Sequence, residues 1–257
     1  MSMESIKLTQ ESPKVKEYKY HFKEIENLRE PMQTILEGLK EKIETGEYQL
    51  IIGEDASGRI PTRVIERIVK ERYKENNYAQ PDVRFVAGPG QCADDRALLN
   101  AEKVRIKYIN EIKKKAKKRR SDIKKALLIT DTVIGGNSLL PLANALKKNN
   151  LSFDIATIQV RTAGDIKELK KKLGAETIVW GEEFSFDDEK NIYGKYDIAG
   201  VEKTPPHLFS ESYAKKYSDH YKSQIFLQKD VNTAREDAKI LAEELMKSYK
   251  NALAAKK

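Results

Sequence analysis

The residues best suited to chemistry lie between Thr130 and Ser138, in the run Thr-Asp-Thr-Val-Ile-Gly-Gly-Asn-Ser. Gly135 and Gly136 have no side chains, so their backbone amides can approach an anion closely. Ser138 opens a stretch with helical spacing, and the N-terminus of a helix favours negative charge. Asp131 can accept hydrogen bonds from the hydroxyl groups of a sugar that carries a phosphate. The pattern predicts a phosphate-binding loop with a carboxylate beside it.

A second candidate loop follows the first predicted strand. It comprises Asp55, Ala56, Ser57, Gly58 and Arg59. Its small residues permit close approach of the backbone to an anion, and the guanidinium of Arg59 could neutralise that anion. Each of the two loops also has an interpretation that involves no ligand. The first loop could be an ordinary strand-to-helix turn that uses glycine for its geometry, and the second a polar connection.

Hydrophobic runs of strand length alternate with segments of helical spacing along the chain. The predicted strands are Tyr48–Gly53, Val83–Ala87, Ala126–Thr130, Phe153–Val160 and Thr177–Trp180. The predicted helices are Ile25–Ile43, Ile60–Tyr73, Arg96–Arg120, Ser138–Lys148 and Asp165–Leu173. This order predicts an α/β fold with a mainly parallel central sheet and helices on both faces. Ligands bind beyond the carboxyl ends of the strands in such sheets, which places both candidate loops at one edge.

The flanks of this alternating region have a different character. We expect three parts: an N-terminal helical segment over residues 1–46, an α/β core over 47–180, and a cap with C-terminal helices over 181–257. The polar and aromatic stretch after Gly181 contains several Gly and Pro residues, which predicts an irregular cap. Two helices, about Leu208–Phe226 and Val231–Leu253, are expected to close the chain.

Composition narrows the compartment and the chemistry. The chain has 257 residues, of which 39% are hydrophobic, enough for a substantial core. No apolar run approaches the roughly 18 residues that a membrane helix needs, and the N-terminus lacks a secretory signal, so we expect a soluble cytoplasmic protein without a membrane partner. Cys92 is the only cysteine, and His21, His207 and His220 have no metal-like spacing. The residues therefore identify no metal-ligand set.

The positive charge of the chain is concentrated in one stretch. Lys103 to Lys125 holds 12 basic and 2 acidic residues, a net +10, so the remainder carries −2 of the total of +8. A solvated charged helix explains such a run. Its segment Lys113–Arg120 could also contact a nucleic-acid backbone, because lysine-rich segments bind phosphates without reading sequence.

The run from Thr130 to Ser138 and its context resemble the signature of type I phosphoribosyltransferases. In that signature a hydrophobic strand leads into two acidic residues, a short loop rich in Thr and Gly, and then Ser or Thr. The resemblance spans about Tyr48 to Trp180. It implies that Asp131, at the second acid, holds the ribose hydroxyls of phosphoribosyl pyrophosphate, while Thr130 stands in place of the first acid. The loop that would bind the 5′-phosphate comprises Thr132, Val133, Ile134, Gly135, Gly136, Asn137 and Ser138.

The same resemblance implies a function. The loop Asp55–Arg59 would receive pyrophosphate, and an Mg²⁺-dependent enzyme of nucleotide metabolism would transfer the phosphoribosyl group to a nitrogenous base. The alternative is a non-catalytic regulator that senses a nucleotide, or binds nucleic acid through residues 103–125; the missing acid at Thr130 favours it. A different nucleotide-binding α/β protein is a third reading. The oligomeric state stays open, with a homodimer as one option.

Overall fold

The structure is a computed structural model. It describes residues 19–56, 58–87, 95–118, 122–161, 166–184, 198, 201–203, 210–212 and 221–254. Ser57, Cys92, His207 and His220, and most of the predicted cap, lie outside these residues. Within the described part of the chain, no helix is both long enough and apolar enough to cross a membrane.

Five parallel strands form the central sheet, which confirms the predicted fold class. They are β1 (Leu50–Glu54), β2 (Asp82–Val86), β3 (Lys125–Val133), β4 (Ser152–Arg161) and β5 (Thr177–Phe184). Their order across the sheet is β2-β1-β3-β4-β5. The central strands are buried on both faces, which is why they appear in the sequence as continuous apolar runs.

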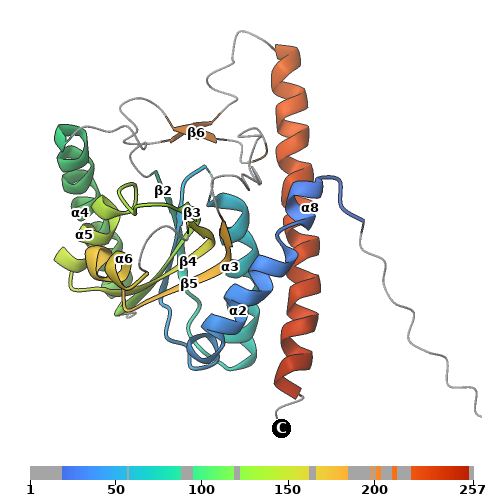
Figure 1. Cartoon of the computed structure of the whole chain (residues 1–257), viewed down its shortest axis with the longest axis horizontal. Coiled ribbons are helices and arrows are strands. Elements are labelled where there is room, and N and C mark those ends of the chain that lie inside the picture. Colours follow the sequence, from blue (N-terminus) through green and yellow to red (C-terminus); the bar gives the residue numbers. More distant parts are fainter. Residues whose placement is uncertain are drawn as a thin grey trace, which may run out of the picture.

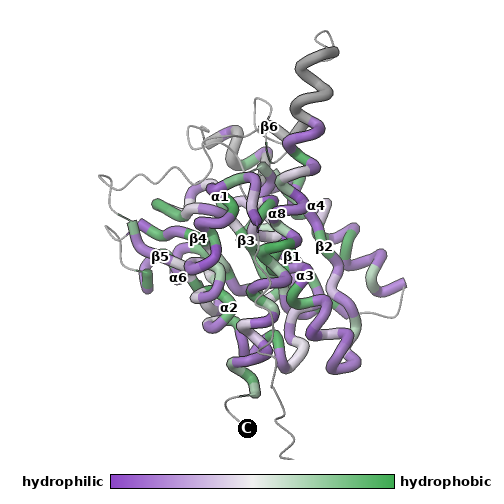
Figure 2. Tube along the Cα trace, turned by 90° about the vertical axis from the view of Figure 1, so that its right-hand side faces the viewer, coloured by the Kyte–Doolittle hydropathy of each residue, from purple (hydrophilic) through white to green (hydrophobic). Residues whose placement is uncertain are grey.

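Helices cover both faces of the sheet (Figure 1). The helices are α1 (Lys23–Glu26), α2 (Arg29–Glu44), α3 (Arg59–Glu75), α4 (Asp95–Lys118), α5 (Leu140–Lys148), α6 (Ile166–Leu173) and α8 (Tyr221–Ala254). One core cluster joins the sheet to α2, α3 and α8, and the other joins it to α4, α5 and α6. Hydrophilic and hydrophobic residues alternate along the surrounding helices (Figure 2), as expected when one face of a helix lies in the core.

Several element boundaries differ from the predictions. The first predicted helix is interrupted at Asn27 and Leu28, which separate α1 from α2. Strand β3 runs to Val133, three residues further than predicted, because pairing with β4 continues to that point. At the C-terminal end the predicted helix Leu208–Phe226 is wrong in its first part, since Ser210–Ser212 forms strand β7, antiparallel to β6 (Val201–Lys203). Pairing with a partner strand overrides local propensity there.

The last helix is longer than the sequence pattern suggested. Helix α8 runs without interruption from Tyr221 to Ala254, and the polar residues Gln228 to Asp230 lie inside it. These residues are acceptable in a helix, so the gap in the apolar pattern is no helix end. Figure 1 shows α8 standing along the side of the molecule formed by α2 and α3.

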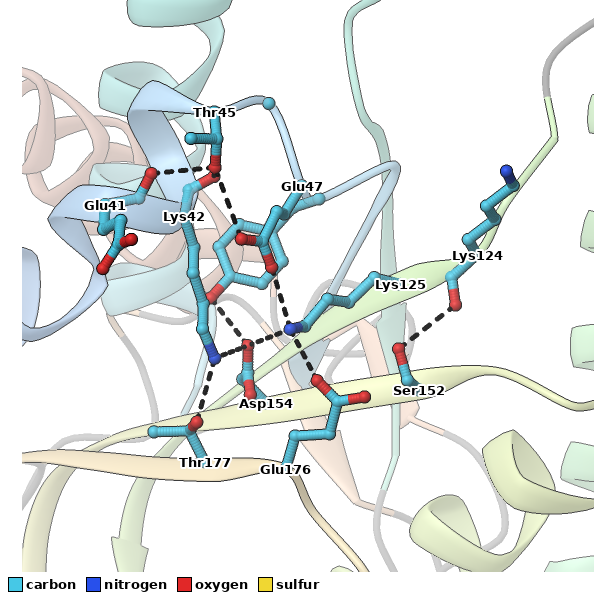
Figure 3. Close-up of polar contacts among 12 residues, drawn as sticks. Glu41, Lys42, Thr45, Glu47, Lys124, Lys125, Ser152, Asp154, Glu176 and Thr177 are labelled. Carbon is cyan, nitrogen blue, oxygen red and sulfur yellow. Dashed lines mark hydrogen bonds and ion pairs between the residues drawn. The ribbon is translucent and has the colours of Figure 1, made fainter.

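A buried polar network joins elements at the edge where the strands begin (Figure 3). The carboxylate of Asp154 on β4 is fully buried and accepts hydrogen bonds from Lys42 Nζ at 2.8 Å and Tyr48 Oη at 2.9 Å. Lys125 Nζ lies 3.3 Å from the same carboxylate. Burial, reinforced by the charge of Asp154, raises the pKa of Tyr48 far above its usual range, so the phenol stays protonated and donates. The network ties α2 to the starts of three strands.

The order of the strands creates a switch point at the opposite edge of the sheet. From β1 the chain proceeds to β2 on one side, whereas β3, β4 and β5 follow one another on the other side. The loops that leave β1 and β3 therefore diverge to opposite faces of the sheet. In open α/β sheets the crevice for ligands forms at this position, beyond the carboxyl ends of the strands.

Candidate functional site

The loop after β3 begins later than the sequence predicted. Thr132 and Val133 belong to the strand and pair with Gln159 and Val160 of β4, and the Val133 side chain is buried in the core. The turn itself runs from Ile134 to Leu139 and leads into α5. Ile134 is 42% exposed, which is unusual for a large apolar side chain beside a polar turn.

Four amides of this turn have no hydrogen-bond acceptor in the described part of the chain. Leu139 and Leu140 donate to the carbonyl of Gly136, both at 3.1 Å, and these bonds start α5. The four amides from Gly135 to Ser138 donate no hydrogen bond to the described part of the chain. The α5 N-terminus also has no side-chain cap. Unpaired amides at a helix N-terminus can hold an anion, so the turn is a candidate phosphate site.

Helix α6 holds this turn in place. Gly136 has a φ of +73°, and an added Cβ would lie 2.7 Å from Leu169 Cδ1 on α6. Lys172, one turn further along α6, donates from Nζ to the Gly135 carbonyl at 2.6 Å and to Asn137 Oδ1 at 2.7 Å. Because an ammonium group has three donors, one remains for a ligand. Lys172 therefore places a positive charge beside the turn.

Asp131 and Thr130 end the buried part of β3 at the switch point. Asp131 is partly exposed, and its Oδ1 lies 3.2 Å from Thr130 Oγ1. The hydroxyl of Thr130 is fully buried and donates to Glu54 Oε2, at the end of β1, at 2.7 Å. A carboxylate from the neighbouring strand thus lies next to the position where the phosphoribosyltransferase signature has its first acid.

The buried side chain of Arg105 interacts electrostatically with the carboxylate of Glu54. Arg105 on α4 is 1% exposed and donates to the carbonyl of Ala87, just after β2. Burial lowers the pKa of Arg105 to about 10, and the negative charge of Glu54 opposes that shift. Arg105 belongs to the basic stretch that the sequence presented as a solvated helix. In the structure Arg105 is instead buried, and its hydrogen bond to the Ala87 carbonyl links α4 to the end of β2.

The loop after β1 is largely engaged with the protein itself. Asp55 accepts hydrogen bonds from the Ala56 amide at 3.0 Å and from Arg59, whose guanidinium also stacks on Phe85. Gly58 is buried, and an added Cβ would lie 2.5 Å from the Glu54 carbonyl and 2.8 Å from the Ile129 carbonyl. This glycine therefore lets the loop pack against β1 and β3. Ser57 lies outside the described residues.

The structure brings together the ends of β1 and β3, from which the two predicted loops start, and adds three residues that sequence reasoning missed: Glu54, Arg105 and Lys172. The position of Glu54 beside Thr130 depends on the register between β1 and β3, which no local pattern encodes. Lys172 stands in a run of three lysines at the end of α6, which the sequence presents as a charged helix end. In the described part of the chain, no group of three or more His, Cys, Asp or Glu residues could hold a metal ion.

Fold and site together define an α/β protein with a glycine-rich turn, a candidate anion site, at the switch point of a parallel sheet. No family model and no curated protein sequence matches the chain. Among solved structures it is similar to the xanthine-guanine-hypoxanthine phosphoribosyltransferase of Helicobacter pylori, with 12% identity and a TM-score of 0.33. The match covers 68% of this chain and 97% of that one. A similarity at this level assigns neither a family nor an activity.

Proposed function

We propose that this protein binds a sugar phosphate, either phosphoribosyl pyrophosphate or the 5′-phosphate of a nucleotide, in the crevice between β1 and β3. The observation that carries the proposal is the set of amides from Gly135 to Ser138, which have no acceptor in the described part of the chain and lie at the switch point. These amides would hold the phosphate, with Lys172 beside them. Asp131, three residues before the turn, would accept hydrogen bonds from the sugar hydroxyls.

Mg²⁺ fits this site as a companion of the ligand. Mg²⁺ keeps several water molecules and binds through one or two carboxylates together with substrate phosphates. Asp131 is partly exposed at the end of the buried part of β3 and can provide one carboxylate, whereas Glu54 is buried and interacts electrostatically with Arg105. The ion would neutralise the negative charge of a pyrophosphate group, and the protein would contribute Asp131 and the amides of the turn.

Two candidate functions share this binding site. In a phosphoribosyltransferase, the protein would hold the ribose and the departing pyrophosphate while a nitrogenous base attacks, a task of positioning and charge stabilisation. In a non-catalytic sensor, binding of the ligand would be the whole function. Thr130 favours the sensor, because its hydroxyl donates to Glu54 and provides no carboxylate of its own.

A thermal-shift titration with phosphoribosyl pyrophosphate, with and without Mg²⁺, tests the proposal. We expect a rise in Tm that depends on Mg²⁺ and is lost in Asp131→Asn. Asp122→Asn is the matched control, because Asp122 is exposed just before β3. The absence of a shift at millimolar ligand would remove the proposal. Release of pyrophosphate in the presence of a panel of bases then separates the enzyme from the sensor.

A further inference from the structure

Helix α4 presents a row of lysines to solvent. Its residues Arg105, Ile109, Ile112 and Ala116 are buried, at a spacing of four, three and four that fixes which side of the helix faces the protein. The exposed lysines on the opposite side are Lys103, Lys107, Lys114, Lys117 and Lys118. At about 100° per residue these five lysines fall within an arc of roughly 100°, and they extend over about 22 Å of the helix. We call them the α4 lysine row.

The lysine row lacks the acidic partners that surface lysines usually have. No ion pair involves any of its five members within the described part of the chain. The ion pair of α4 with its neighbour α5 uses Glu102 and Lys148. Lys114 and Lys118 stand four residues apart, as do Lys103 and Lys107, and like charges at this spacing destabilise a helix. The dipole of the helix favours lysines in its last turn only, so it does not explain Lys103, Lys107 and Lys114.

We propose that the α4 lysine row binds a single-stranded nucleic acid through its phosphates. A polyanion matches an extended row of five lysines that form no ion pair in the described part of the chain and have only Glu111 beside them on α4, and its binding releases condensed counterions. Tyr108 is 36% exposed on the flank of the row and offers an aromatic face on which a base can stack. This function goes beyond the proposed crevice, because the row lies on the outer face of α4.

Two other occupants fit the row less well. A membrane-binding helix inserts an apolar face, but the large apolar residues in the C-terminal half of α4, such as Ile109 and Ile112, are buried in the protein. Of the exposed apolar residues of α4, Leu99 and Val104 lie in the N-terminal half and Tyr108 lies just past the middle, so they form no continuous apolar face along the row. A second copy of the chain would bring two positive rows together, and their repulsion opposes such an interface.

Fluorescence anisotropy with a labelled oligonucleotide of about 20 thymidines or uridines tests the proposal, with the salt concentration varied. We expect the logarithm of the association constant to fall linearly with the logarithm of the salt concentration. The slope should be about −0.7 for each phosphate contact with a single strand. Replacement of the five lysines by glutamine should lower the affinity at least tenfold and flatten this slope. Replacement of the same five by arginine should preserve both. Tyr108→Ala should lower the affinity without changing the slope.

The control variant must remove the same number of positive charges from another part of the protein surface. Lys23, Lys74, Lys229, Lys239 and Lys247 are exposed on the side of α1, α3 and α8, and their replacement by glutamine changes the net charge equally. An equal loss in this control would overturn the row, as would binding to vesicles of anionic lipid without binding to the oligonucleotide. Asp131→Asn should leave the oligonucleotide affinity unchanged. If it abolishes that affinity, the strand occupies the crevice and the row is not the site.

Discussion

At the scale of single residues, the turn after β3 contains two adjacent glycines with different roles. An added Cβ on Gly135 meets nothing within 4 Å, whereas Gly136 has a φ of +73° and faces Leu169 and Leu173 of α6. Gly135 therefore leaves open space beside the amides that would hold a phosphate. Gly136 provides the left-handed backbone conformation of the turn and leaves room for the side chains of α6.

The difference between the two glycines predicts different effects of the same substitution at each position. Gly136→Ala should destabilise the protein by about 1–2 kcal/mol, the cost of a left-handed backbone for a residue with a Cβ, and should weaken binding of phosphoribosyl pyrophosphate. Gly135→Ala should change stability by less than about 0.5 kcal/mol. Urea unfolding and calorimetric titration measure the two effects. Equal destabilisation by both substitutions would contradict the assigned geometry.

Lys172 provides a second prediction at this scale. Lys172→Met should raise the Kd for phosphoribosyl pyrophosphate about tenfold, because a charge-assisted hydrogen bond to phosphate is lost. Lys171→Met is the control, since Lys171 is exposed on the same helix and has no contact with the turn. A Kd that stays the same in both variants would show that Lys172 only braces the loop.

The sequence predicted some of these site residues but not others. A glycine-rich turn into a helix after the third strand was predictable, because the residue types that provide open backbone and a helix start are local in the sequence, but its start at Ile134 instead of Thr130 was not. The link from Thr130 to Glu54 was not, because it joins residues 76 positions apart through strand register. Gly58 was identified for a reason that the structure does not support, since it is packed against β1 and β3. Close approach to a ligand and close approach to another strand both require glycine.

At the scale of elements, the buried network around Asp154 fixes the starts of the strands. Removal of this carboxylate would leave Lys42, Lys125 and Tyr48 without their common acceptor. Asp154→Ala should therefore cost about 3–5 kcal/mol of stability, the range for one partner of a buried ion pair. Urea unfolding measures this cost.

A control on the same network keeps this prediction specific. Glu176 pairs with Lys125 at 2.7 Å but its side chain is 50% exposed. Glu176→Ala should cost less than about 1 kcal/mol, because exposed ion pairs contribute little. The affinity for a sugar phosphate should stay unchanged in any Asp154 variant that folds, because the network lies at the opposite edge of the sheet. A selective loss of affinity would refute this separation of roles.

Elements were the most predictable part of the molecule. The alternation of strands and helices was correct throughout the sheet because buried parallel strands leave continuous apolar runs. The errors lie where a short strand of polar residues leaves no apolar run, as in β7, or where the apolar pattern is interrupted, as in the middle of α8. The order of the strands, and with it the switch point, follows from chain connections that no single segment specifies.

At the scale of the whole molecule, α8 ties the last part of the chain to the first. The buried carboxylate of Asp237 accepts hydrogen bonds from the amides of His21 at 3.0 Å and Phe22 at 2.8 Å, just before α1. Asp237→Ala should cost about 1–3 kcal/mol, because two partly buried amides lose their acceptor. It should also speed cleavage by trypsin at Lys19 and Lys23. Asp230→Ala, exposed on the same helix, should do neither.

The position of α8 in the core has a consequence for synthesis of the protein. Its residues Ala234, Ala238, Leu241 and Leu245 complete the apolar cluster that α2 and α3 begin. On the ribosome, α2 and α3 emerge long before the helix that covers them, so the nascent chain carries an uncovered apolar face until α8 has been synthesised. Such a chain is prone to aggregate. Chaperone protection should therefore be needed until α8 has left the ribosome, and a truncation after Asp230, which removes Ala234 to Leu245, should yield aggregates in place of a shortened folded protein.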